Sequence, residues 1–216
     1  MYLSQIILND RDRKVRHDLS NIHNLHRSIM QAFPDIEPLP DEEQKRVRAD
    51  WQILFRLEPD SNVLLVQSEL EPNWGKVLTS YPNYLSQQQC KPFQPEVGQF
   101  PVDRLLRFRL KANPSKRDNE TRKTVGLYYQ PDQEAWFGRQ AAQHGFSVEG
   151  LDIIPAANLW GAKVKGQAQI KIHTALFQGI LKVQDPALFV KAVRQGIGKG
   201  KSYGCGLLSL QRIDLR

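Results

Sequence analysis

The chain has 216 residues, a length that fits one large domain or two small domains of about 100 residues each, and either arrangement can bury a core. The composition, 40% hydrophobic and 25% charged, is that of an ordinary globular protein and excludes disorder, a collagen-like fold and a disulfide framework. The net charge of +7 divides unevenly, because residues 1–100 carry −3 and residues 101–216 carry +10. A basic half is typical of a protein that binds a polyanion, most often nucleic acid, although a solvated basic surface has the same signature.

Hydrophobic patterning in the first half predicts three strands and two helices. Apolar residues at helical spacing from Ile22 to Phe33 follow the capping residue Ser20 or Asn21, and Pro34 ends that helix. The expected order is a strand over 2–8, this helix, a polar loop over 35–50, strands over 51–57 and 62–69, a helix over 73–80 and a connection over 81–101.

The second half has a similar order of predicted strands and helices. Residues 105–111 alternate strictly between apolar and basic side chains, as a half-buried strand does, and 124–129 is expected to pair with them. The remaining elements are a helix from Pro131 to Gly145, strands over 146–154 and 167–183, a helix from Asp185 to Gly196 and a strand over 207–210.

Each half therefore approximates the order βαββαβ, which predicts an α+β fold of two tandem ferredoxin-like (RRM-like) domains. We assign residues 1–90 to an N-terminal domain that carries a histidine cluster and residues 91–102 to a linker. Residues 103–216 form a C-terminal domain with a basic face and a glycine-rich loop.

The two cysteines, Cys90 and Cys205, belong to no CxxC pair, which argues against a thiolate zinc site and favours reduced thiols in a cytoplasmic protein. No apolar run approaches the roughly 18 to 20 residues that span a bilayer. In MYLSQIILNDRDRK the charges follow the apolar stretch, which indicates a strand and not a signal peptide. We therefore expect a cytoplasmic protein with no membrane segment.

Three of the five histidines lie within ten residues, and His23 and His26 are three apart on the first predicted helix. With unperturbed pKa values of about 6.5, two imidazoles can act as acid and base near neutral pH. Metal ligation and a purely surface position are the alternatives that the spacing leaves open.

Basic residues gather in three segments of the second half. From Arg104 to Lys123 there are eight basic residues against two acidic ones, a composition suited to contacts with phosphates. A second basic segment carries Lys163 and Lys165 in a predicted hairpin. The third, GIGKGKSYGCGLLSL, has five glycines in eleven residues and is suited to cradle a phosphate, although its spacing is not that of a P-loop.

Four segments in chain order resemble one family: MYLSQIIL, NLHRSIMQAFP, RFRLKANPSKR and GIGKGKSYGCGLLSL. Over essentially the whole chain they resemble the CRISPR RNA-processing endoribonuclease of the Cascade complex, the CasE family within the RAMP superfamily. The resemblance implies tandem ferredoxin-like domains that bind the stem-loop of a CRISPR repeat transcript and cut at its base. The family needs neither metal nor cofactor, uses the 2′-hydroxyl as nucleophile and leaves a cyclic phosphate.

The resemblance also implies that the enzyme stays bound to the processed hairpin with the other Cascade subunits, and we expect a monomer when it is isolated. The family's catalytic histidine corresponds to His26, its active-site tyrosine to His23, and a lysine of some members to Gln31. Such a reaction needs a proton acceptor, a proton donor and positive charge near the phosphorane. His26 would serve as general acid or base, and His23 would take the second proton role or orient the phosphate.

The residues expected to bind RNA are polar or basic and come from all three basic segments: Arg107, Arg109, Lys111, Asn113, Lys116, Arg117, Lys163, Lys165, Lys199, Lys201 and Ser202. Two other functions compete with the nuclease. One is a non-catalytic RNA-binding module of a ribonucleoprotein complex. The other is a metal-dependent nuclease that uses the acidic stretch from Asp35 to Glu43, which we interpret instead as a solvated loop.

Overall fold

The computed structural model describes residues 1–36, 39–162 and 170–213. In it the chain divides into two compact units. The first unit holds Met1–Gln94, the described residues of Leu159–Lys171, and Ser202–Gly204. The second unit holds Pro95–Asn158, Ile172–Lys201 and the residues from Cys205 onward. The first boundary, between Gln94 and Pro95, falls inside the 91–102 segment expected to act as a linker.

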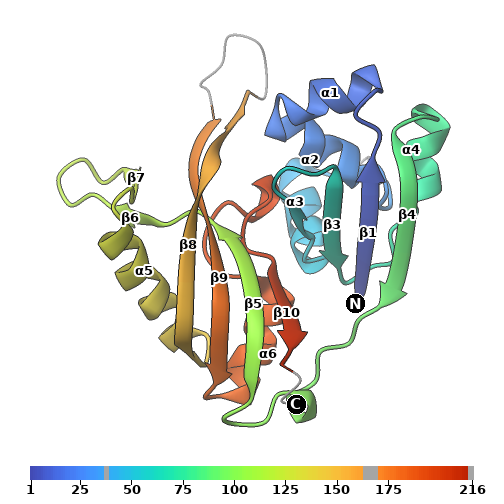
Figure 1. Ribbon diagram of the computed structural model, residues 1–216. Helices are drawn as coiled ribbons and strands as arrows, with labels where there is room; N and C mark the ends of the chain where they lie inside the picture. Colours follow the sequence, from blue (N-terminus) through green and yellow to red (C-terminus); the bar gives the residue numbers. More distant parts are fainter. Residues whose placement is uncertain (37–38, 163–169, 214–216) are drawn as a thin grey trace. The chain divides into compact units, whose positions relative to one another are not determined.

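The first unit contains a four-stranded sheet of order β2-β3-β1-β4, with helices α2 and α4 packed against it (Figure 1). Its strand pairs β1–β3, β1–β4 and β2–β3 are all antiparallel. The elements are β1 (Tyr2–Leu8), α1 (Arg13–Leu19), α2 (Ile22–Met30), α3 (Asp41–Asp50), β2 (Leu54–Leu57), β3 (Val63–Ser68), α4 (Trp74–Ser80) and β4 (Leu85–Pro92).

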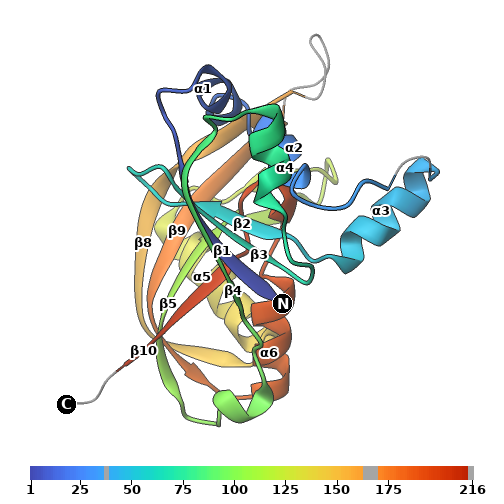
Figure 2. The same cartoon turned by 90° about the vertical axis from the view of Figure 1, so that its right-hand side faces the viewer.

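The core of the first unit lies between one face of this sheet and the helices. Ile6 and Leu8 alternate inward from β1 and meet the apolar side of α2, where Leu25 and Ile29 are buried. In Figure 2, α2 and α4 lie on the same side of the sheet. Trp74 of α4 joins this core. The core therefore fixes which side of α2 faces the sheet and which side carries its polar residues.

The second unit contains a second four-stranded sheet, of order β10-β5-β9-β8, with α5 and α6 packed on it (Figure 1). Its elements are η1 (Val97–Gln99), β5 (Leu105–Ala112), β6 (Ser115–Arg117), β7 (Thr124–Gly126), α5 (Gln130–Gln143), β8 (Phe146–Gly161), β9 (Ile170–Val183), α6 (Pro186–Gln195), η2 (Lys201–Tyr203) and β10 (Leu208–Arg212). The last residues of β8, the first of β9 and the end of η2 belong to the first unit.

Aromatic rings fill the core of the second unit. Phe137 of α5 stacks on Phe108 of β5 and on Phe177 of β9, with ring centroids 5.3 and 4.9 Å apart. Phe189 of α6 packs edge-on against Phe146 at 5.8 Å. The inward position of Phe108 confirms the predicted alternation of β5, in which Leu106 and Leu110 are buried on the same face.

Both sheets have the same order, 4-1-3-2, when strands are counted within their own unit and the β6–β7 hairpin is set aside. This is the βαββαβ ferredoxin-like arrangement, which confirms the predicted fold class. The duplication is visible in topology although the two halves share no sequence repeat.

Three of the predicted elements of the first half were wrong. The segment 35–50 contains α3, since Glu, Gln, Lys, Arg and Ala after Pro40 favour a helix even without an apolar stripe. The segment 81–101 contains β4, an edge strand whose residues are mostly exposed and therefore lack apolar alternation. The strand expected from residue 51 begins only at Leu54, because Trp51 caps α3 and stacks on Phe33.

Two further differences concern local pairing and capping. Residues 124–126 form β7, which pairs with β6 and not with β5, because the intervening chain turns back on itself at once. Helix α1 went unpredicted, although Asp12 caps it by accepting hydrogen bonds from the backbone of Lys14 and Val15. Both cysteines are free, and no helix in the described ranges is long and apolar enough to cross a membrane.

Candidate active site and basic surface

Helix α2 places both candidate catalytic histidines on one side of the first unit. Asn21, one of the two capping residues that the sequence left open, caps the helix by accepting a hydrogen bond from the backbone N–H of His23 at 3.1 Å. Leu25 and Ile29 bury the opposite side of the helix. His23 and His26 are both partly buried and lie one turn apart, so the structure brings this pair together as expected.

The imidazole of His26 lies among aromatic rings. Phe55 of β2 stacks on it with 6.4 Å between ring centroids and 21° between ring planes. Tyr203 of η2 meets it edge-on at 6.3 Å and 63°. Its Nδ1 is buried and has no hydrogen-bond partner among the residues that the structure describes.

These surroundings lower the pKa of His26 from 6.5 to about 4. The main cause is desolvation by burial, and the positive charges of His23 and Arg48 add to it. His26 is therefore neutral at pH 7, and a neutral imidazole can accept a proton from a hydroxyl group.

The N-terminus of α2 is also tied to the end of β8 within the first unit. Asn21 donates to the carbonyl of Ala162 at 3.2 Å and accepts from its N–H at 3.3 Å. Gly161 permits this approach, because a Cβ there would lie 2.9 Å from Asn21 Oδ1. One side chain thus caps the helix and holds the backbone just before residues 163–169.

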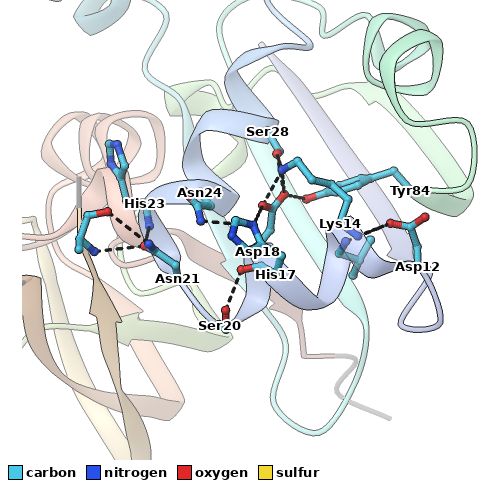
Figure 3. A network of polar contacts seen from close by, with 12 residues as sticks. Asp12, Lys14, His17, Asp18, Ser20, Asn21, His23, Asn24, Ser28 and Tyr84 are labelled. Atoms are coloured by element: carbon cyan, nitrogen blue, oxygen red, sulfur yellow. Dashed lines mark hydrogen bonds and ion pairs between the residues drawn. The ribbon is translucent and has the colours of Figure 1, made fainter. Parts of the chain in front are cut away.

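A buried polar network fixes α2 against α1 and against Tyr84, the residue before β4 (Figure 3). Asp18 is fully buried and accepts hydrogen bonds from Ser28 Oγ at 2.6 Å and from the Tyr84 hydroxyl at 2.7 Å. Lys14 Nζ donates to both oxygens of Asp18, at 2.5 and 2.6 Å, and to Ser28 at 2.9 Å. Ser28 follows His26 by two residues, so this network holds the helix segment that carries the histidines.

The predicted basic strand face lies in the second unit. Arg107 and Arg109 point away from the core of β5 and are exposed, and Lys111 is partly exposed. Arg109 donates to Gln178 on the neighbouring strand β9 at 3.2 Å. This alternation confirms that one face of the strand is basic.

In the same unit, part of the glycine-rich loop lies beside the segment that follows β5. Asn113 and Lys199 form an isolated β-bridge, and Lys199 Nζ donates to Thr124 Oγ1 at 3.3 Å. Lys116 and Arg117 lie exposed on β6, which is paired with the strand of Thr124. Six of the residues expected to bind RNA therefore lie on β5, β6 and their connection, and Lys199 pairs with one of them, Asn113.

The remaining candidates are distributed differently. Lys201 is partly buried in the second unit, and desolvation lowers its pKa from the usual value. Ser202 is exposed and belongs to the first unit. Lys163 and Lys165 lie outside the described residues.

Sequence reasoning missed three residues that surround the histidines: Asn21 as an anchor of β8, Phe55 and Tyr203. Tyr203 lies in the glycine-rich segment that the sequence had singled out, but only its lysines and serine were considered there. No local sequence pattern around Tyr203 indicates its contact with His26, which lies 177 positions earlier in the chain. Among the described residues, no group of three or more His, Cys, Asp or Glu side chains could hold a metal ion.

The fold and the site together define a tandem ferredoxin-like protein with an imidazole pair in one unit and a basic strand face in the other. The sequence profile of the family described as CRISPR associated protein matches residues 1–212. The chain belongs to this family.

The relatives include two full-length proteins with names that describe their roles. The chain is 33% identical to the CRISPR-associated endoribonuclease Cse3 of Thermus thermophilus, over 97% of this chain and 99% of that protein. It is 30% identical to the CRISPR system Cascade subunit CasE of Escherichia coli K12, over 97% and 98%. Among solved structures, CRISPR endoribonuclease Cse3 bound to a 19-nucleotide RNA superposes with a TM-score of 0.82, 31% identity and coverage of 98% of this chain and 100% of that one.

Proposed function

We propose that the protein is a metal-independent endoribonuclease that binds the stem-loop of a CRISPR repeat transcript and cleaves precursor CRISPR RNA at the base of that hairpin. The observation that carries this proposal is the neutral, partly buried imidazole of His26 on a capped helix, beside His23. Full-length similarity to an endoribonuclease supports the same activity.

In the proposed reaction the ribose 2′-oxygen bonds to the adjacent phosphorus, and the bond from phosphorus to the 5′-oxygen breaks. His26 accepts the proton of the 2′-hydroxyl, because it is neutral in the free protein. His23, one turn away, starts in its protonated form and donates a proton to the departing 5′-oxygen, so that His26 ends protonated and His23 neutral. The products are a 2′,3′-cyclic phosphate and a free 5′-hydroxyl, with protons and charge in balance.

Basic residues of the second unit hold the RNA in this proposal. Duplex RNA hides its base edges in a deep, narrow groove, so phosphate and 2′-hydroxyl contacts dominate its recognition. The exposed arginines of β5 and the lysines of β6 and the glycine-rich loop suit such contacts. Lys163 and Lys165, which follow Ala162 in the sequence, are assigned to the same duplex.

The protein then remains on the processed hairpin as a subunit of a Cascade complex, as the similarity to CasE supports. The residues before Gln94 carry the catalytic histidine, and those after Pro95 supply most of the RNA-binding side chains. We place this assembly in the cytoplasm.

The test is single-turnover cleavage of repeat hairpin RNA in excess chelator. Wild-type protein should cleave the RNA, and His26→Ala should not. A single 2′-deoxy substitution at the cut site should block cleavage, and His23→Phe should slow it. His17→Ala is the matched control, since His17 is exposed on α1 outside the pair, and it should behave as wild type.

Each failure has a distinct meaning. RNA that is bound but left intact by wild-type protein would support the non-catalytic RNA-binding module. Cleavage abolished by the chelator would support a metal-dependent nuclease. Unchanged cleavage by His23→Phe would remove His23 from the reaction.

A further inference from the structure

We propose that Tyr203 is a positioning residue for the reaction, holding the imidazole of His26 against Phe55 through an edge-on ring contact. The inference rests on the proposed function, since it concerns how the catalytic imidazole is oriented. It adds a residue of the C-terminal glycine-rich segment to the environment of a histidine on α2.

Two aromatic rings contact the imidazole of His26. Phe55 is 1% exposed and presents its ring nearly parallel to that of His26, 21° apart. Tyr203 approaches at 63°, so its ring meets the imidazole edge-on. Aromatic pairs prefer offset-stacked and edge-to-face arrangements at such separations, and both arrangements occur here on one imidazole. The ring of His26 is therefore contacted from two directions.

The backbone next to Tyr203 is built to bring it there. Gly204 adopts a φ of +80°, a region that residues with a Cβ rarely occupy. A Cβ at Gly204 would lie 3.1 Å from Phe55 Cε2, so the backbone after Tyr203 rests directly on the Phe55 ring. The same phenylalanine thus supports both the loop and the imidazole.

A missing hydrogen bond at Nδ1 of His26, among the described residues, explains why ring contacts are needed to orient the imidazole. In many active sites a carboxylate or carbonyl accepts a bond from one ring nitrogen and so fixes the orientation of the imidazole. Here Nδ1 is buried without a partner in the described part of the chain. A hydrogen bond at Nδ1 therefore does not fix the ring, and packing against Phe55 and Tyr203 constrains its rotation.

The groups that face His26 are either neutral or cationic. His23 on α2 and Arg48 on α3 act on it by charge, and Tyr203 and Phe55 act by excluding water. Burial raises the pKa of the Tyr203 phenol, which therefore stays neutral wherever the imidazole titrates. Removing the phenol ring should readmit water and let His26 protonate more readily.

The first experiment follows the imidazole of His26 by NMR without RNA, in a pH titration. Wild type and Tyr203→Phe should titrate near 4, because both keep the ring, and Tyr203→Ala should move the midpoint upward toward 6.5. Tyr129→Ala is the matched control: that tyrosine is 78% exposed in the second unit, and its loss should leave the midpoint unchanged.

The second experiment measures single-turnover cleavage at saturating repeat RNA, together with RNA affinity. Tyr203→Phe should cleave as wild type does. Tyr203→Ala should lose roughly tenfold to a hundredfold in rate at unchanged affinity, because small displacements of a reacting group have effects of this size. Tyr203→Leu, which retains apolar volume but no ring, should also be slow and serves if the alanine variant does not fold.

The outcomes separate this inference from the proposed function. If wild type fails to cleave, the proposed function is wrong, whereas the NMR titration still reports on the contact. If wild type cleaves and Tyr203→Ala matches it in both rate and titration midpoint, the positioning role is wrong. Equal losses in Tyr203→Phe and Tyr203→Ala would also overturn it, since the hydroxyl and not the ring would then act.

Discussion

The protonation of His26 depends on the residues packed around it. In water the imidazole would be charged in about half of the molecules near pH 6.5. In the folded protein, burial among aromatic rings and the nearby charges of His23 and Arg48 favour the neutral form. The same contacts that prepare His26 to accept a proton therefore link its protonation to folding.

This linkage predicts how stability varies with pH. The pKa of His26 is about 4 in the folded protein and about 6.5 in the unfolded chain, so only the unfolded chain binds the proton between these values. The contribution is complete above pH 6.5 and is lost as the pH falls toward 4, for a total of about 3 kcal/mol. Urea unfolding should show wild type losing about that much more free energy of unfolding from pH 7 to pH 4 than His26→Asn.

The other histidines are common to both proteins, so the difference isolates His26. Equal pH dependence in the two proteins would mean that His26 titrates normally in the folded state.

At the scale of elements, Asn21 at the N-terminus of α2 joins the helix that carries His23 and His26 to the end of β8. Asn21 accepts from the N–H groups of His23 and Ala162 and donates to the carbonyl of Ala162. The sequence narrowed the cap to Ser20 or Asn21, because capping residues act on their immediate neighbours. The bonds to Ala162 were not, since they join residues 141 positions apart.

Replacing Asn21 separates these two functions. Asn21→Ala removes the cap and both bonds to β8, and should lower the free energy of unfolding by about 1 to 2 kcal/mol. Asn21→Asp keeps both acceptor functions and loses only the donor, so it should be less destabilised. Hydrogen exchange gives a local check: the Ala162 amide should lose protection in Asn21→Ala and keep it in Asn21→Asp. Equal protection in both variants would contradict the anchoring role.

The local pattern of cap residues and apolar side chains also explains which helices and strands were predicted from the sequence. Helix α6, Pro186–Gln195, is capped by Asp185 and Gly196, the residues expected to bound it, because its cap residues and its apolar stripe agree. Helix α3 and strand β4 were missed because neither buries an alternating or helical apolar face. Their positions are determined by the strands and helices they join, which the local sequence does not describe.

At the scale of the whole molecule, the division of charge predicts how RNA binding responds to salt. Phosphate contacts release counterions, so the logarithm of the affinity falls linearly with the logarithm of the salt concentration, with a slope near one per contact. The double variant Arg107→Gln/Arg109→Gln should reduce the magnitude of that slope by about 2, measured by equilibrium binding of repeat hairpin RNA between about 50 and 200 mM salt.

A charge-matched control is available on α1, where Arg13 and Arg16 are also exposed. Arg13→Gln/Arg16→Gln removes the same charge from the first unit and should leave the slope unchanged. Equal effects of the two double variants would mean that the basic face of β5 has no special contact with RNA, and that net charge alone decides affinity.

The sequence by itself determined the repeated βαββαβ order except for β4, the histidine pair on one helix and the basic half of the chain. Each of these is a property of spacing or composition, which acts over a few residues or over the whole chain without regard to contacts. Only the tertiary structure decided what surrounds the histidines. Phe55 and Tyr203 reach His26 from positions 29 and 177 residues away in the chain, and ring contacts at such separations leave no periodic trace in the sequence. The identity of the candidate base was therefore open to prediction, whereas its neutrality depends on the folded packing around it.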